Sequence, residues 1–329
     1  MYTDDRPGHQ TPPSRETRRR EPSGEAKRRG PGATAVAVSS VIVVLIVLGV
    51  AWAFYHGSSK LTSVTLGPSS STNSPPSSST DDSQAAPIGG RAKKVNIAPP
   101  STWKLAFNSD FAGSALDTNV WTTCYKYTSP GDGCTNHGNS SENDWYLPSQ
   151  DQVSGGMLQL IAQHEPTEGT SASNTPEEYS CRSGMITTAP SFNFEYGYVQ
   201  MVARLPYGAG LWPAFWLAAS DDAWPPEVDI FEHWGSQASA GVYLHSTNGT
   251  RQGGRADGLS NLSQGWHTFT LSWTENKLTW YIDNNQVFST TTGIPQQDMY
   301  IIANLANTST AATSCSGSML IKSIKVWQP

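Results

Sequence analysis

The chain has 329 residues and a net charge of −6, a length that suits one large domain or two smaller ones. The charge is unevenly distributed, because residues 101–329 hold nine Lys or Arg against twenty Asp or Glu, a net of −11. Since contacts to phosphates require Lys and Arg, this composition excludes a typical nucleic-acid-binding domain. The same region is rich in Trp, Tyr, Gly, Ser, Thr and Asn, which suits a neutral polar ligand with flat apolar faces.

The N-terminal part of the chain has the pattern of a membrane anchor. Residues 1–32 are polar and basic and are expected to form a disordered cytoplasmic tail. Residues 33–55 contain no charge, and as a helix they would span about 34 Å, enough to cross a bilayer core. Because basic residues precede this run, the positive-inside rule predicts an uncleaved signal anchor with the N-terminus inside. Cleavage of a signal peptide near Ala53, followed by secretion, is the alternative.

A linker separates this anchor from the rest of the chain. Residues 56–100 are dominated by Ser, Thr and Pro, a composition that cannot bury a core. We therefore expect a single-pass protein of the cell membrane, with the linker and residues 101–329 outside the cell.

Residues 101–329 alternate apolar and polar side chains with a period of two. The stretch WHTFTLSW places His267, Phe269, Leu271 and Trp273 on one face, and a turn and a second alternating run follow it. A sustained apolar repeat of 3.6 residues does not occur in this region. The pattern predicts one all-β domain, a sandwich or barrel that can offer a concave sheet face to an extended ligand.

Four cysteines are present, and none belongs to a CxxC pair, so the spacing does not match a zinc ribbon or a redox motif. Three disulfide pairings are possible. We favour Cys124 with Cys134, because a short turn-rich loop separates them, and this leaves Cys181 to pair with Cys315. Free buried thiols are the alternative.

Three acids interrupt a strand-like stretch with the sequence EVDIFE, where Glu227, Asp229 and Glu232 are spaced by two and then by three residues. Alternate residues of a strand point to the same face, so Glu232 rejoins the face of the other two acids only if one residue is inserted. The spacing therefore predicts a β-bulge near Ile230 and Phe231. Two carboxyl groups facing each other in one groove are what retaining glycoside hydrolysis requires, and a third carboxyl can hold their pKa values apart.

Tryptophans surround these acids. Trp212 and Trp216 precede them in the stretch GLWPAFWL, and Trp224 and Trp234 bracket them. Aromatic faces stack on sugar rings through apolar area and CH groups. The combination favours a carbohydrate site over a solvated acidic strand.

With these residues in view, the sequence resembles glycoside hydrolase family 16, in its laminarinase-like branch. The similarity covers essentially all of residues 101–329, and its motifs occur in the same order as in the family. They are FNSDFAGSALDTNVW, SSENDWY, RSGMITT, GAGLWPAFW, EVDIFE and MYIIANL.

The resemblance implies a concanavalin A-like jelly roll with a sugar-binding cleft. It implies that Glu227 is the nucleophile, Glu232 the general acid/base and Asp229 their assistant. His233, next to Glu232, is expected to point away from the acids and to be structural. The expected substrate-binding residues are Glu142, Trp212, Trp216, Trp234, His245 and Asn304.

Two departures from the family pattern concern ligands. Val202 stands where many members have an arginine, so one sugar contact is expected to be missing or supplied otherwise. The family's calcium site on the convex face often uses two acids, for which Asp110 could serve as the first, but Lys322 occupies the place of the second. We therefore expect no cofactor and no bound metal, and a structural calcium is disfavoured.

The leading hypothesis is a retaining endo-β-glycanase that cleaves β-1,3- or mixed-linkage β-glucan and acts as a monomer on its polysaccharide. One alternative is a hydrolase or transglycosylase acting on an exopolysaccharide or a cell-surface glycan. A second, of another class, is a glycan-binding protein without catalysis, which is disfavoured because both glutamates are present.

Overall fold

The computed structural model describes residues 93–94, 97–126, 133–235, 238–308 and 315–329. The predicted cytoplasmic tail, the membrane span at 33–55 and most of the linker lie outside these ranges. Among the described residues, no helix is long and apolar enough to span a membrane.

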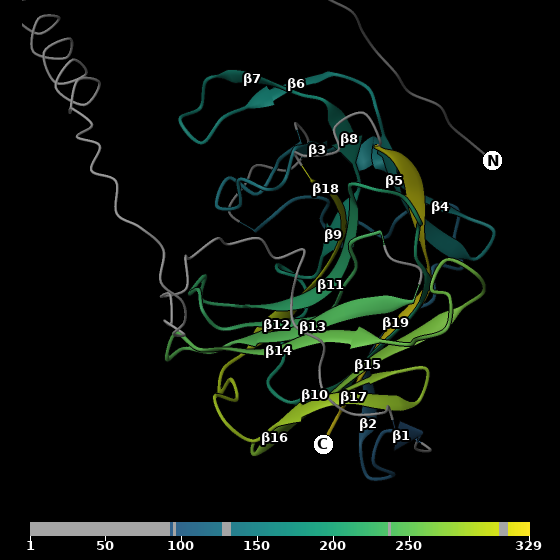
Figure 1. Ribbon diagram of the computed structural model, residues 1–329, viewed down its shortest axis with the longest axis vertical. Coiled ribbons are helices and arrows are strands. Elements are labelled where there is room, and N and C mark those ends of the chain that lie inside the picture. The colour runs from purple at the N-terminus through teal and green to yellow at the C-terminus, as the bar shows by residue number, and fades with distance from the viewer. Residues whose placement is uncertain (1–92, 95–96, 127–132, 236–237, 309–314) are drawn as a thin grey trace, which may run out of the picture. The chain divides into compact units, whose positions relative to one another are not determined.

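Two large β-sheets face each other and make up the body of the fold (Figure 1). Their strands are antiparallel except where β3 pairs with β8. In spatial order, the eleven-stranded sheet consists of β1 (Lys93–Lys94), β17 (Asn285–Thr290), β16 (Lys277–Ile282), β15 (His267–Thr274), β10 (Gly197–Arg204), β19 (Ser316–Gln328), β5 (Met157–Gln163), β8 (Cys181–Ser183) and β3 (Asp144–Tyr146), with β2 (Lys104–Ser109) also on β19 and β4 (Asp151–Ser154) also on β5. The six-stranded sheet consists of β14 (Arg251–Asp257), β13 (Ser239–His245), β12 (Glu227–Glu232), β11 (Leu211–Ala219), β18 (Met299–Asn307) and β9 (Met185–Thr187).

Smaller elements complete the described part of the chain. The hairpin of β6 (Thr167–Thr170) and β7 (Pro176–Tyr179) forms a sheet of its own at the top of Figure 1. The 3₁₀ helix η2 (Pro148–Gln150) is the only helix within the described ranges. The all-β sandwich predicted from the alternating pattern is therefore confirmed. Lys93–Lys94, which we had placed in the linker, instead pair with β17 at the edge of the larger sheet.

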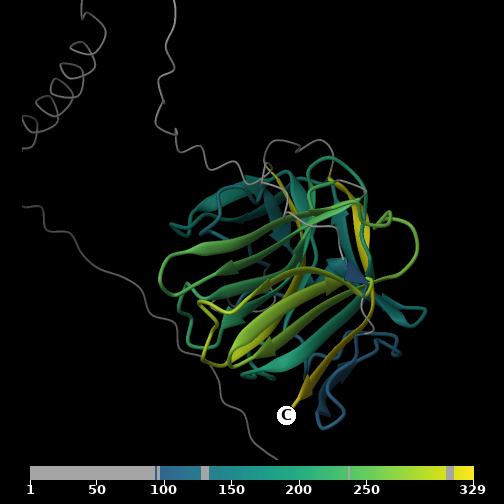
Figure 2. The same cartoon turned by 60° about the horizontal axis from the view of Figure 1, so that its bottom comes forward.

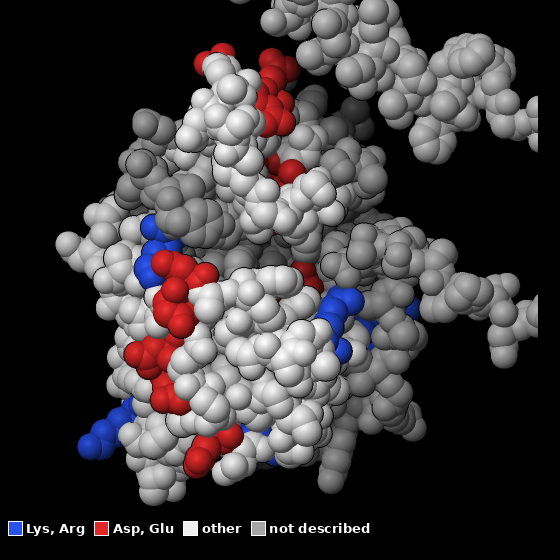
Figure 3. Space-filling view, turned by 90° about the vertical axis from the view of Figure 1, so that its left-hand side faces the viewer, with Lys and Arg blue, Asp and Glu red and all other residues white. Residues whose placement is uncertain are grey.

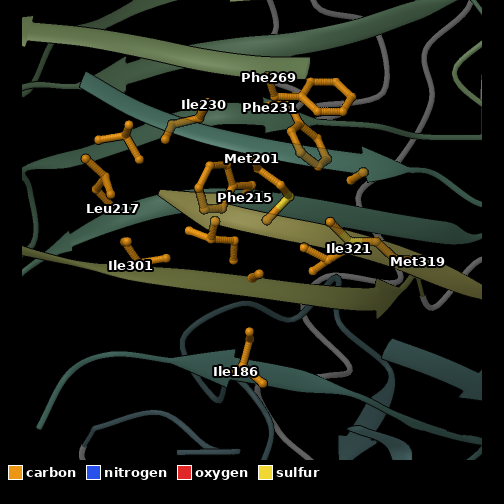
Figure 4. Packing of buried hydrophobic residues seen from close by; sticks show 14 of the residues in the cluster. Ile186, Met201, Phe215, Leu217, Ile230, Phe231, Phe269, Ile301, Met319 and Ile321 are labelled. Atoms are coloured by element: carbon orange, nitrogen blue, oxygen red, sulfur yellow. The ribbon is translucent and has the colours of Figure 1, made fainter. Parts of the chain in front are cut away.

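The two sheets stack on each other (Figure 2), and the main hydrophobic core lies between them (Figure 4). The long central strands of both sheets contribute mainly alternate residues to it, as a sheet with one buried face requires. The smaller sheet provides Phe215 and Phe231, for example, and the larger sheet provides Met201, Phe269 and Ile321. Phe231 and Phe269 meet across the sandwich with ring centroids 4.2 Å apart.

The other face of the six-stranded sheet is also partly covered. Every residue of β18 is buried, although only alternate ones face the main core. Its Tyr300 and Ile302 belong to a second cluster, which includes Tyr125 and Tyr146 and against which Trp216 of β11 packs. This second layer covers the sheet face at β9 and part of β18, next to the face of β11, β12 and β13.

The strand β12 contains the predicted bulge. Its register against β13 shifts between Asp229 and Glu232, and β11 shifts at the same level. Ile230 and Phe231 are consecutive, yet both are buried in the main core (Figure 4). The extra residue returns Glu232 to the face of Asp229, so the bulge is confirmed.

Both favoured disulfides are formed. Cys124 pairs with Cys134 across a separation of 10 residues, and Cys181 pairs with Cys315 across a separation of 134. The second bond joins β8 to the segment just before β19, so it ties the middle of the chain to its last strand.

Candidate active site

A groove crosses the outer face of the six-stranded sheet, and the three acids of β12 lie in it. Glu227, Asp229 and Glu232 line its inner part together with residues of β11, β18 and the loop before β3. The adjoining outer part of the groove, which shares Glu227 and Glu232 with the inner part, has a volume of about 710 Å³. Pockets for small molecules usually measure about 300–1,000 Å³. Figure 3 shows this side of the molecule, which is hollowed across its middle with Asp and Glu side chains in the hollow.

Strand register brings the acids of β12 opposite particular neighbours. Glu227 pairs with His245 of β13, and Glu232 pairs with Gly241. On the other side, Trp216 of β11 lies opposite Asp229. Because the register is antiparallel, residues far apart in the sequence share one row of the sheet face.

The first two acids and the histidine form one cluster. His245 Nε2 lies 3.6 Å from Glu227 Oε1 and 3.5 Å from Asp229 Oδ2. Trp224 Nε1 donates a hydrogen bond of 3.2 Å to the other oxygen of Glu227. Burial and the Asp229 carboxylate raise the pKa of Glu227 to about 8, while His245 and Trp224 act in the opposite direction.

The imidazole of His245 responds to the same neighbours. Burial alone would lower its pKa, but the nearby carboxylates of Asp229 and Glu227 together raise it. A protonated His245 therefore favours an ionised carboxylate at Glu227, so the titrations of these two groups are coupled.

Glu232 lies at the other end of the row. Its Oε1 accepts a hydrogen bond of 3.1 Å from Trp212 Nε1. Trp212 in turn packs against Trp234, with ring centroids 6.0 Å apart. The carboxyl group of Glu232 is thus oriented by an indole that itself lines the groove.

A chain of hydrogen bonds crosses the floor of the groove. Trp216 Nε1 donates to Asn304 Oδ1 at 2.9 Å, and Asn304 Nδ2 donates to the Tyr146 hydroxyl at 2.9 Å. The hydroxyl donates to Glu142 Oε2 at 2.8 Å, and Asn136 donates to the other oxygen of that carboxyl. Every donor points toward Glu142, which is the final acceptor of the chain. Burial raises the pKa of Glu142 to about 7.

Most of the residues expected from the sequence share this groove, but one does not line it. The groove contains Glu142, Trp212, Trp216, His245 and Asn304 as well as the three acids. Trp234 instead packs between Trp212 and Tyr243. It fits there because Gly241 leaves room, since a Cβ at that position would come within 2.7 Å of the Trp234 ring.

His233, which precedes Trp234 in the sequence, does not line the groove either, in keeping with the expected structural role. It is buried, with 1% of its surface exposed.

Sequence reasoning did not assign several groove residues. Trp224 lies in the loop before β12 and exposes 68% of its surface beside the nucleophile candidate. Asn136 and Asn139, from the loop after Cys134, line the opposite wall. The only sequence signal for this loop is its run of Asn, Gly and His. The run has no periodicity, so it does not predict which of its side chains face the groove.

Metal-ligating side chains come together at one place in the described ranges. Ligand atoms of Glu227, Asp229 and His245 all lie within 4.8 Å of one another. The two positions considered for calcium have other contacts, because Asp110 caps the Ala112 N–H and the Lys322 ammonium lies 5.4 Å above the Trp266 ring.

Comparison with known proteins agrees with this geometry. Residues 139–323 match the family Glycosyl hydrolases family 16. Endo-1,3-1,4-beta-glycanase ExsH of Rhizobium meliloti is 32% identical over 215 residues, which is 61% of this chain and 44% of that protein. The chain thus matches less than half the length of this relative.

Solved structures are similar as well. The laminarinase from Flavobacterium sp. UMI-01 is 30% identical, with a TM-score of 0.56, over 68% of this chain and 100% of that one. The laminarinase catalytic domain from Thermotoga maritima MSB8 is 23% identical, with a TM-score of 0.58, over 69% of this chain and 98% of that one. The class of protein is defined by a jelly-roll sandwich with a row of acids on one strand of its groove. The residues that match the family model, 139–323, make up more than half of the chain. This chain belongs to glycoside hydrolase family 16.

Proposed function

We propose that this protein is a retaining endo-β-glucanase that hydrolyses β-1,3- or mixed-linkage β-glucan. The observation that carries the proposal is the bulged strand β12, which turns Glu227, Asp229 and Glu232 into one groove. Endo-glucanase names among the relatives, such as the endo-1,3-1,4-beta-glycanase of Rhizobium meliloti, support the choice of substrate.

In the first step, the Glu227 carboxylate attacks the anomeric carbon while the Glu232 carboxyl gives its proton to the leaving oxygen. The glycosidic bond breaks, and a glycosyl ester on Glu227 forms with inverted configuration. The Trp212 indole holds Glu232 toward the leaving group through its hydrogen bond. Trp224 and His245 hold Glu227 and favour its ionised form.

In the second step, Glu232 accepts a proton from water as the water attacks the same carbon. The ester bond breaks, Glu227 leaves as a carboxylate, and the second inversion restores the original configuration. Asp229 lies between the two glutamates on the strand and, with His245, sets the charge around the nucleophile.

Substitution of the two glutamates tests this proposal. Glu227→Gln should remove activity on laminarin, measured as release of reducing ends. Glu232→Ala should also fail on laminarin but keep the first step on an aryl glucoside, whose leaving group needs no proton. Anomeric analysis of the products by NMR should show retention.

Four outcomes would contradict the proposal. Unchanged activity in Glu227→Gln would remove the nucleophile, and inverted products would exclude the ester. A wild-type protein that binds glucan without releasing reducing ends would instead be a glycan-binding protein. Transfer to a sugar acceptor instead of water would indicate a transglycosylase.

We also infer that the catalytic domain is displayed outside the cell from a membrane anchor at 33–55 and works as a monomer. The charge-free run and the basic residues before it support the anchor. The two disulfides are typical of an oxidising compartment. Protease treatment of intact cells should remove the activity from the membrane fraction. Recovery of the active protein in the medium, with an N-terminus near Ala53, would favour secretion instead.

A further inference from the structure

The cluster of Glu227, Asp229 and His245 has the form of a metal-binding site as well as of a catalytic one. Two carboxylate oxygens and one imidazole nitrogen converge from adjacent strands, and all three lie within 4.8 Å of one another. The donors come from β12 and β13, whose paired backbones fix their separation, since Glu227 and His245 are direct register partners.

Two of the three distances in the cluster are close to the edge of a metal tetrahedron. Zinc binds histidine nitrogen at about 2.0–2.1 Å and carboxylate oxygen at about 2.0–2.2 Å, so two ligands of a tetrahedral zinc lie about 3.4 Å apart. His245 Nε2 lies 3.6 Å from Glu227 Oε1 and 3.5 Å from Asp229 Oδ2. These gaps are too long for good hydrogen bonds. All three atoms lie within 4.8 Å of one another, close enough to share one ion after the side chains adjust.

A second observation also indicates a cation here. Asp229 Oδ2 is buried and accepts no hydrogen bond within the described part of the chain. The side chain of Asp229 is only 5% exposed, and the charged groups near that oxygen are the His245 imidazole and the like-charged Glu227 carboxylate. A buried carboxylate oxygen without a hydrogen-bond donor is a costly arrangement that a bound cation would relieve.

The chemistry of the donors selects the kind of ion. Calcium and magnesium prefer six or more oxygen ligands, whereas an imidazole with two carboxylates suits zinc and its neighbours among the transition metals. Two carboxylates also balance the charge of a divalent ion. The fourth position of the tetrahedron would face the groove, which both Glu227 and His245 line.

We propose that Glu227, Asp229 and His245 bind a zinc ion reversibly and that this ion inhibits the enzyme. The bound ion occupies the carboxylate that attacks the sugar, so zinc and glucan exclude each other. The binding site stands on its geometry alone, whereas the inhibition rests on the proposed function.

Two measurements on the full chain, stripped with a chelator, test the site. Calorimetric titration with ZnCl₂ should give one strong site. Substitution by Co²⁺ should give the intense visible absorption of a tetrahedral ion. His245→Ala and Asp229→Asn should each weaken zinc binding by at least about 10–100-fold, the loss that even an outer hydrogen-bond partner of a ligand typically causes. His164→Ala is the matched control, because this histidine is exposed and absent from the groove lining, and it should bind zinc as the wild type does.

The outcomes separate the site from the function. Absence of strong binding by the wild type, or strong binding that survives both substitutions, would overturn the site. Zinc should raise the KM for laminarin and leave kcat unchanged; a fall in kcat with an unchanged KM would overturn the competition. If the metal-free protein has no activity, the proposed function fails, while the cobalt spectrum still decides the site. Circular dichroism of both variants, together with two independent substitutions, guards against loss of binding by misfolding.

Discussion

Removal of the Tyr146 hydroxyl tests whether the hydrogen-bond chain under the groove positions the sugar-binding surface. Tyr146 is fully buried, and its hydroxyl accepts from Asn304 at 2.9 Å and donates to Glu142 at 2.8 Å. Tyr146→Phe deletes one oxygen and otherwise preserves the packing. The loss comprises one neutral hydrogen bond and one to a carboxyl, which together are worth about 2–4 kcal/mol of unfolding free energy.

This loss should be visible in both stability and kinetics. For a domain of this size, the melting temperature should fall by roughly 5–15 °C. Asn304 then loses its anchor, and Trp216, which donates to it, is no longer held in one orientation. We expect KM for laminarin to rise by about tenfold, equivalent to about 1.4 kcal/mol of binding free energy. The change in kcat should be smaller, because the acids of β12 do not belong to this chain of hydrogen bonds.

The assay should be run at pH 8, above the pKa of Glu142, so that its carboxylate is charged. Tyr179→Phe is the matched control, since its hydroxyl makes one hydrogen bond to the Thr170 carbonyl in the β6–β7 hairpin. The control should lose about 1 kcal/mol and keep the wild-type KM. A Tyr146→Phe protein as stable as the control, or one with an unchanged KM, would refute the reasoning.

Three further outcomes are expected. Asp229→Asn removes the charge that raises the pKa of the nucleophile Glu227. Since the nucleophile must be ionised to attack, the acid limb of the kcat/KM profile should move to lower pH. A move to higher pH would contradict the assignment. Trp212→Phe keeps the ring but removes the hydrogen bond to the acid/base, so kcat on laminarin should fall more than kcat on an aryl glucoside, and equal falls would disprove the positioning role. Replacing both Cys181 and Cys315 by Ala opens a loop of 134 residues and should cost about 5 kcal/mol in urea unfolding, against about 3 kcal/mol for the pair separated by 10 residues; the reverse order would show that loop length does not govern their effects.

The acidic strand could be read from the sequence because its irregularity is local. A change in spacing from two to three leaves few ways for Glu227 and Glu232 to share a face, and the apolar pair Ile230 and Phe231 marks where the extra residue lies. The cysteine pairs were predictable for a similar reason, since one short loop determines the first pair and the second follows.

Other parts of the site depend on packing that the sequence does not display. Nothing in the pattern distinguishes Trp234 from Trp224, yet one packs over Gly241 and the other is exposed on the groove. Asn136 and Asn139 reach the site through a loop without periodicity. The pairing of Lys93–Lys94 with β17 was also hidden, because an edge strand of two residues is too short to show alternation.

The bond between Cys181 and Cys315 has one more effect, on the integrity of the molecule after damage. The acids of β12 and the strands β9 to β18 all lie within the loop that it closes. A single peptide-bond cut anywhere in that loop gives two fragments that stay covalently joined. The nicked protein would migrate as one species until a reductant is added, so it can keep its groove assembled among proteases that would separate an uncrosslinked chain.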